Sequence, residues 1–215
     1  MTEVPGPTLE QLLDEVAAAT PSPGGGACCG WAAALAAALI EMAAGVAEAR
    51  GADAEARRAG AEARGAGAEA RGADAEARRV GAEGIDRMTQ IRLRATDLRR
   101  QATELAERDR DSYGPVLAAQ RSGDAAEVRL ALARASDTPF ALTAVAAELA
   151  GLAQEVLATG RPSLEGDAVT ALELARASCR AAANLVMLNL KSLPADPRRQ
   201  AVQALLEHAG GTASA

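Results

Sequence analysis

The chain has 215 residues, of which 49% are hydrophobic but only three are aromatic, and its formal net charge is −6. This length suits one domain with a buried core, and the negative charge argues against nucleic acid as a partner. Strand signals are absent, because β-branched and aromatic residues nowhere alternate with polar ones. We therefore expect a single all-α domain over residues 1–215, built as a multi-helix bundle.

Several kinds of site are excluded by residue type. The three cysteines lack metal-ligand spacing and give no readable disulfide framework, and His208 is the single histidine. Neither a metal site nor a histidine-based triad is therefore expected. The N-terminus lacks the features of a signal peptide. The apolar segment 31–47 is short and interrupted by Glu41, so it predicts a buried or interface helix rather than a membrane span. We expect a cytoplasmic protein without a membrane partner.

The first predicted helix follows Thr8, which forms a capping box with Gln11, and ends near Ala19. Residues 20–26 then read Thr-Pro-Ser-Pro-Gly-Gly-Gly. The prolines forbid a helix, while the glycines leave the backbone N–H groups uncovered. A long alanine-rich helix is predicted from about Gly26 through Val46. Because a helix N-terminus carries unpaired donors and partial positive charge, the glycine turn is either an anion site or a plain loop.

Residues 47–83 form a low-complexity heptad repeat rich in Ala, Gly and Arg. The block Ala47–Glu62 recurs as Ala68–Glu83 with one change, which indicates a recent tandem duplication. A coiled coil needs large apolar residues at its core positions, and here those positions offer only alanine. We expect a helical or partly disordered exposed arm inserted in the bundle. The heavy use of Ala, Gly and Arg suggests a bacterial source with a GC-rich genome.

The remaining elements are also predicted to be helices. A basic helix begins at Ile85 and extends to about Gln120, with a kink or break at Gly114–Pro115. A short helix follows Ser122-Gly-Asp124 and ends near Arg134. Three more helices are predicted: one capped by Thr138 with Pro139 at its first position, one capped by Asp167 after a loop over 159–166 and reaching Lys191, and one from Asp196 to Gly210.

Four segments in this order carry a resemblance to a known family. They are the Pro-Gly-Gly-Gly turn, the stretch Leu105–Tyr113, the loop Gly160–Asp167, and Asn184–Leu193 with the sequence Asn-Leu-Val-Met-Leu-Asn-Leu-Lys-Ser-Leu. Together they resemble the cyclodeaminase/cyclohydrolase family, meaning the cyclodeaminase domain of formiminotransferase-cyclodeaminase and its stand-alone bacterial relatives. The resemblance covers most of the chain outside the repeat.

The resemblance implies an all-helical homodimer that acts on folate. Family members convert 5-formimidoyl-tetrahydrofolate to 5,10-methenyl-tetrahydrofolate with loss of ammonia, or hydrolyse the methenyl form to the formyl form. A tetrahydrofolate derivative would thus be the substrate, and the enzyme would be a C–N lyase or hydrolase. The catalytic residues would be Asp109, Asp167 and Tyr113.

The residue types fit acid and base catalysis. A carboxylate whose pKa is raised by burial can take a proton from the attacking nitrogen or protonate departing ammonia. Asp109 and Asp167 are the candidates, although Asp167 could simply cap a helix and Asp109 could be a solvated charge. The predicted substrate-binding residues are Pro23, Gly24, Gly25, Gly26, Trp31, Asn184, Asn189 and Lys191.

Each binding residue has a structural alternative. Trp31 could stack on a pterin or fill a core or dimer gap. The two asparagines could bind ligand atoms or the backbone. Lys191 and the arginines of segment 87–100 could meet the acidic tail of folate, or those arginines could form surface salt bridges.

The sequence departs from the family at three places. The repeat replaces a lysine-rich stretch, Cys28-Cys29 replace smaller residues after the glycines, and Glu165-Gly166 precede Asp167 where the family has a serine. These departures leave two alternatives to a folate enzyme. One is a divergent member that acts on another small molecule in specialised biosynthesis, and the other is a non-catalytic scaffold whose arm binds a partner.

Overall fold

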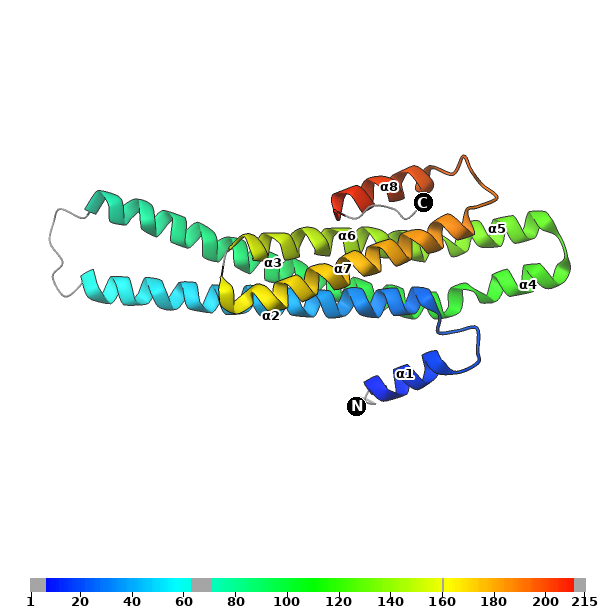
Figure 1. The fold of residues 1–215 in the computed structure, drawn as a ribbon, viewed down its shortest axis with the longest axis horizontal. Coiled ribbons are helices and arrows are strands. Elements are labelled where there is room, and N and C mark those ends of the chain that lie inside the picture. The colour runs from blue at the N-terminus through cyan, green and yellow to red at the C-terminus, as the bar shows by residue number, and fades with distance from the viewer. Residues whose placement is uncertain (1–6, 63–70, 160, 211–215) are drawn as a thin grey trace, which may run out of the picture.

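The computed structural model describes residues 7–62, 71–159 and 161–210. The described residues contain helices and no strand, as the sequence predicts. Figure 1 shows a long bundle with its helices nearly parallel to one axis. The helices are α1 (Leu9–Ala17), α2 (Gly25–Glu62), α3 (Arg71–Ser112), α4 (Gly114–Ser122), α5 (Ala125–Ala135), α6 (Asp137–Ala158), α7 (Pro162–Asn189) and α8 (Pro197–His208).

The core is built from α2, α3, α6 and α7 packed side by side. It consists mainly of alanine, with larger side chains such as Ile40, Ile91, Leu98 and Leu149 between them. Alanine lets helix axes approach closely, so the long alanine-rich helix α2 contacts α3, α6 and α7 together. Its larger residues Leu35 and Met42 are exposed by 59% and 41%. Small residues therefore occupy the buried face of α2.

Two ladders of ion pairs fix the position of α3 between its neighbours. Arg92 and Arg99 pair with Glu48 and Glu41 of α2, while Arg87 and Arg94 pair with Glu155 and Glu148 of α6. In both ladders a step of seven residues forward on α3 is a step of seven backward on its partner. The pairing is thus antiparallel on both sides. Exposed pairs of this kind contribute at most about 1 kcal/mol each, so they specify register more than stability.

The repeat forms an extension of the same α2–α3 pair. Figure 1 shows the two helices projecting beyond the bundle at one end. A methyl group on Gly51 would lie 2.7 Å from the Ile85 side chain, so the close approach of the two helices continues to the base of this arm. The repeat prediction also covers residues 63–70, which lie outside the described residues. Within the described part, the arm is helical.

Two predicted helix starts are wrong. Helix α6 begins at Asp137 after Ser136, so Thr138 and Pro139 lie in its first turn rather than at its cap and first position. Helix α7 begins at Pro162, so Asp167 lies inside the helix, and residues 162–166 do not form the predicted loop. Proline suits a first turn because its missing N–H would have no partner there. Burial of Leu164 and Ala168 against the core favours the longer helix.

Other predicted boundaries are confirmed. Thr8 and Gln11 form the capping box of α1. The predicted helix break at Gly114–Pro115 separates α3 from α4. Asp124 and Asp196 cap α5 and α8, each accepting from a main-chain N–H two residues on.

Two helical stretches, Gly25–Arg57 and Ala125–Ala158, have the length and hydropathy of a membrane span. About half of the apolar window in each stretch is buried within the bundle, which is typical of core helices.

Candidate functional site

The N-terminus of α2 lies directly against the end of α3. A methyl group built on Gly26 would meet Asp109 Oδ1 at 2.2 Å, so only glycine leaves room for the carboxyl group at this position. The Ala27 N–H donates a hydrogen bond to that carboxyl group. Asp109 thus satisfies one of the unpaired donors that begin a helix. The Asp109 carboxylate of α3 therefore lies at the positive end of the α2 dipole.

The glycine-rich turn is fastened to the same end of α3. Ser22 Oγ donates to the Arg110 main-chain oxygen at 2.7 Å, and the Arg110 guanidinium pairs with Glu15 of α1 at 2.8 Å. Ser112 Oγ donates to the Asp109 main-chain oxygen at 2.9 Å. These contacts hold the turn, α1 and the last turn of α3 together around Asp109.

The pKa of the Asp109 carboxyl group is raised above its ordinary value. Burial is the largest cause, and the hydrogen bonds from the Ala27 N–H and the Ser112 side chain lower the pKa by less. Burial favours the neutral form of a carboxyl group, and carboxyl groups with a raised pKa are typical of acid and base catalysts. Asp109 therefore has the electrostatic character of an acid or base catalyst.

A pocket of about 450 Å³ opens in front of Asp109. This volume lies in the range typical of small-molecule sites. Its polar side is formed by the turn residues Gly24–Gly26 together with Asp109, Tyr113 and Asn189. Its apolar lining comes from α5, α6 and α7, through Leu132, Pro139, Leu185 and Leu188. The pocket thus combines donors, a carboxyl group and an amide with a hydrophobic surface.

Six of the residues predicted for the site gather at this pocket. The helix N-terminus contributes the main-chain N–H groups of Gly25 and Gly26, which have no carbonyl four residues earlier in the helix. Tyr113 lies between α3 and α4 and is 39% exposed. The full set of six is Gly24, Gly25, Gly26, Asp109, Tyr113 and Asn189.

The other predicted residues do not line the pocket. Asp167 lies 22 residues before Asn189 on α7, which at helical rise is roughly 33 Å away. Pro23 is buried beneath the turn, and Trp31 is partly buried farther along α2. Asn184 and Lys191 are exposed. One chain therefore does not bring Asp109 and Asp167 together.

The arginines of segment 87–100 are occupied by acidic partners. Arg87, Arg94 and Arg99 pair with glutamates of α6 and α2, as described for the two ladders. Arg100 pairs with Glu104 within α3. This arrangement agrees with the salt-bridge interpretation of these arginines rather than with a site for an acidic tail.

The two adjacent cysteines after the glycines do not line the pocket. Cys29 is buried, and burial is the main cause that raises its thiol pKa to about 11. Its main-chain oxygen accepts a hydrogen bond from Ser178 of α7 at 2.6 Å. Cys28 is partly buried, and burial followed by the charge of Asp109 raises its pKa. Both thiols are therefore neutral at physiological pH, and neither is an activated nucleophile.

The sequence did not reveal the apolar wall or Ser112. Leu132 and Pro139 come from helices joined only by Ser136, and no local motif links them to the glycine turn. Only their spacing of seven residues indicates that the two side chains lie on the same face. Within the described residues, no three His, Cys, Asp or Glu side chains are grouped so that they could hold a metal ion.

A second hollow of about 520 Å³ lies at the base of the arm. Two glutamates line it, Glu55 and Glu155, and Glu155 pairs with Arg87. The pocket at Asp109 is therefore the stronger candidate for chemistry.

Comparison with known proteins agrees with the all-helical fold. The family model described as formiminotransferase-cyclodeaminase matches residues 8–208. The chain belongs to this family. A formiminotransferase-cyclodeaminase fold is also seen in the crystal structure of formiminotetrahydrofolate cyclodeaminase from Thermotoga maritima, which superposes with a TM-score of 0.63. The two sequences are 24% identical, and the match covers 95% of this chain and 88% of that one. No curated protein matches the sequence.

Membership in the formiminotransferase-cyclodeaminase family supports a folate-related cyclodeaminase function in general terms. The matched region runs from the cap of α1 to the end of α8, so it includes the glycine turn, Asp109 and Asn189.

Proposed function

We propose that this protein is a folate-dependent one-carbon enzyme of the cyclodeaminase or cyclohydrolase type, with Asp109 as its acid and base. The observation that carries the proposal is the position of Asp109. Its carboxyl group lies in a pocket, has a raised pKa, and is held against the positive end of a helix. Family membership supplies the substrate class, a tetrahydrofolate derivative.

One carboxyl group can serve both halves of cyclodeamination. With the formimidoyl group in its amidinium form, the second folate nitrogen forms a bond to the formimidoyl carbon and gives its proton to Asp109. The carboxyl group then passes this proton to the terminal nitrogen of the formimidoyl group, the one that is not part of folate. The bond from that nitrogen to carbon breaks, ammonia leaves, and the methenyl product keeps the positive charge. Tyr113 lines the same pocket and can orient the exchanging proton.

The glycine turn would bind the polar edge of the ligand. The N–H groups of Gly25 and Gly26 can donate to a carbonyl or carboxylate oxygen, and the helix dipole favours negative charge there. The apolar wall of Leu185 and Leu188 suits the flat face of a pterin. Asn189 completes the polar side with its amide group.

A second candidate substrate follows from the lack of cations. Among the described residues that line the pocket, none is lysine or arginine. A ligand with several carboxylates would therefore gain little from this pocket alone. This observation favours a divergent member of the family that acts on a related small molecule without an acidic tail. Comparing turnover of mono- and polyglutamyl folates separates the two, since the divergent member gains nothing from added glutamates.

We propose that the protein is a cytoplasmic homodimer. Helices α1 and α2 expose apolar side chains that a second copy can cover, with Leu9 exposed by 71%, Leu13 by 60% and Leu35 by 59%. Light scattering on the purified protein should give the mass of a dimer, and Leu35→Glu should shift it toward the monomer. A wild-type protein that is monomeric at micromolar concentration would contradict this proposal.

The experiment that tests the function is a turnover assay with 5-formimidoyl- and 5,10-methenyl-tetrahydrofolate, followed by absorbance. We expect turnover of at least one of them, and we expect Asp109→Ala to abolish it. Absence of both turnover and folate binding would refute the proposal.

A further inference from the structure

The lining of the candidate pocket includes the junction of α5 and α6. Helix α5 ends at Ala135 and α6 begins at Asp137, so Ser136 alone separates them. Leu132, Ala135 and Pro139 from this junction line the pocket. Ser136 is fully buried, and its hydroxyl donates to the Leu132 main-chain oxygen at 2.9 Å. The shape of the pocket therefore depends on how this junction is held.

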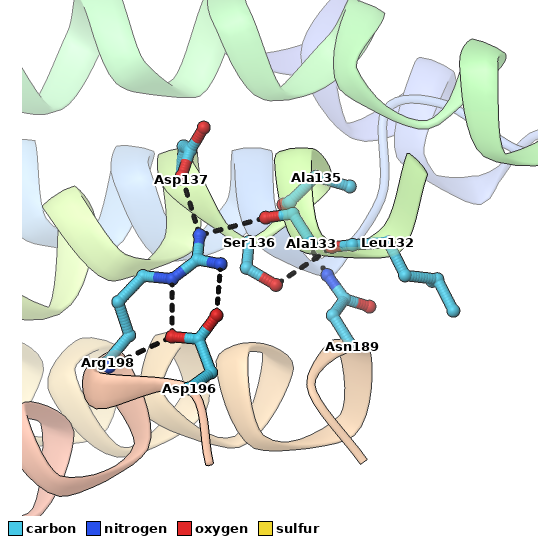
Figure 2. A network of polar contacts seen from close by, with 8 residues as sticks. All are labelled: Leu132, Ala133, Ala135, Ser136, Asp137, Asn189, Asp196 and Arg198. Atoms are coloured by element: carbon cyan, nitrogen blue, oxygen red, sulfur yellow. Dashed lines mark hydrogen bonds and ion pairs between the residues drawn. The ribbon is translucent and has the colours of Figure 1, made fainter. Parts of the chain in front are cut away.

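Arg198 of α8 contacts the junction, as Figure 2 shows, and does not line the pocket. Its Nη1 donates to the Ala133 main-chain oxygen at 2.8 Å and to Asp137 Oδ1 at 2.6 Å. Its Nε and Nη2 donate to the two carboxylate oxygens of Asp196 at 2.9 and 2.7 Å. The two hydrogen bonds to Asp196 fix the orientation of the guanidinium plane, and Nη1 contacts both helices of the junction.

Asn189 meets the same junction from the last turn of α7. Its Nδ2 donates to the Ala135 main-chain oxygen at 3.4 Å. Because a main-chain carbonyl can only accept, the amide nitrogen must face it, and this fixes the orientation of the side chain. Figure 2 shows Oδ1 directed away from the junction. Asn189 also lines the pocket, and an amide oxygen can accept a hydrogen bond from a ligand.

We propose that Arg198 is a positioning residue of the candidate pocket: by fixing the α5–α6 junction, it orients the Asn189 amide so that Oδ1 accepts a hydrogen bond from an N–H group of the ligand. This inference rests on the proposed function for the identity of the ligand. It adds a residue outside the pocket and a requirement on the ligand, which must present an N–H donor next to its flat apolar part. The amide and amino groups at the edge of a pterin are N–H donors of this kind.

A purely structural role for Arg198 has a matched control in the same chain. Arg176 of α7 makes a comparable set of contacts, with Nε donating to the Ala209 main-chain oxygen at 3.0 Å and Nη1 pairing with Glu173 at 3.2 Å. Its side chain is similarly shielded, at 24% exposed against 20% for Arg198. Arg176 does not line the pocket or touch the α5–α6 junction. Truncation of either arginine should lower stability, but only Arg198 should affect ligand binding.

The test compares Arg198→Met, Arg198→Lys and Arg176→Met in the folate turnover assay. One hydrogen bond to a neutral group corresponds to about a tenfold change in affinity. We expect Arg198→Met to raise KM about tenfold while kcat changes less than about threefold, since the lost contact is a uniform binding contact. Arg198→Lys should fall between wild type and Arg198→Met, because lysine cannot form the bidentate pair. Arg176→Met should leave KM unchanged.

Two further measurements separate this proposal from the proposed function. In the Asn189→Ala background, Arg198→Met should no longer raise KM, because both changes remove the same contact. The side-chain amide signal of Asn189 in a ¹H–¹⁵N spectrum, assigned by its loss in Asn189→Ala, should shift in Arg198→Met and not in Arg176→Met. This signal is observed without any ligand, so it decides the role of Arg198 even if no folate is turned over. Additive effects on KM, or an unmoved amide signal, would overturn the inference.

Discussion

Replacement of Gly26 by alanine tests whether the glycine turn exists to admit Asp109. The added methyl group would lie 2.2 Å from Asp109 Oδ1 and 2.4 Å from Oδ2. Carbon and oxygen in ordinary contact are more than 3 Å apart, so the carboxyl group must move by about 1 Å or more. It can do so because it borders the open pocket, and its hydrogen bond from the Ala27 N–H would then be lost.

The magnitude follows from this displacement. A misplacement of about 1 Å in a reacting group costs on the order of 100-fold in rate, or ~2.7 kcal/mol of transition-state stabilisation. The effect on folding should be smaller. Overpacking costs about 1–3 kcal/mol, but the better helix propensity of alanine returns up to ~1 kcal/mol, and the displaced side chain has space to move into. We therefore expect kcat/KM to fall about 100-fold while the free energy of unfolding falls by about 1 kcal/mol.

Two matched glycine variants complete the experiment. Gly166→Ala on α7 meets no atom within 4 Å and should alter neither property by much. Gly30→Ala would place a methyl group 2.9 Å from the Ala102 main-chain oxygen, which forces α2 and α3 apart. It should therefore lose about 1–3 kcal/mol of stability. Urea unfolding and folate turnover would be measured on all three. Wild-type kcat/KM in a folded Gly26→Ala protein would refute the reasoning.

Three further predictions concern the aspartates and the arm. The pKa of Asp109 is raised on folding. Its contribution to stability is therefore full below its unfolded pKa and is lost as pH rises through its folded pKa. When Tm is followed from pH 4 to pH 8, the Tm of Asp109→Asn should depend less on pH than the Tm of wild type. Asp167→Asn should change kcat by less than about threefold, since α7 places this residue far from the pocket; a loss as large as that of Asp109→Asn would mean that a second copy completes the site. Replacing residues 55–81 with a short glycine-serine linker should leave kcat/KM unchanged, because the pocket lies at the opposite end of α2 and α3; lost activity in a folded variant, measured in the same assay, would place function in the arm.

The helices and the family could be predicted from the sequence because their signals are local. Capping residues such as Thr8, Asp124 and Asp196 satisfy helix N-termini through contacts two or three residues long. The break at Gly114–Pro115 is equally local. The predicted starts of α6 and α7 are wrong because two signals compete there. Thr138 and Asp167 resemble caps, but burial of neighbouring residues makes each helix begin earlier in the chain.

The site could be predicted only in part because its other half depends on tertiary contacts. The glycine turn and Asp109 were recognisable, but nothing local shows that Gly26 is small because a carboxyl group from α3 presses against it. The Arg198 contacts with the α5–α6 junction join residues that are more than 60 positions apart. On the buried face of α2, alanine rather than leucine meets the neighbouring helices. In an alanine-rich bundle, residue size is a poor guide to burial.

The most direct test of the central claim is the absorbance assay for conversion of 5-formimidoyl- or 5,10-methenyl-tetrahydrofolate, with wild type and Asp109→Asn measured side by side. Asp111→Asn is the matched control, because Asp111 lies two residues away on the same helix and is exposed. We predict turnover by wild type and Asp111→Asn, and a loss of about 100-fold or more in Asp109→Asn, as expected for a general acid–base catalyst. Turnover that survives in Asp109→Asn, or no turnover and no folate binding by wild type, would contradict the account.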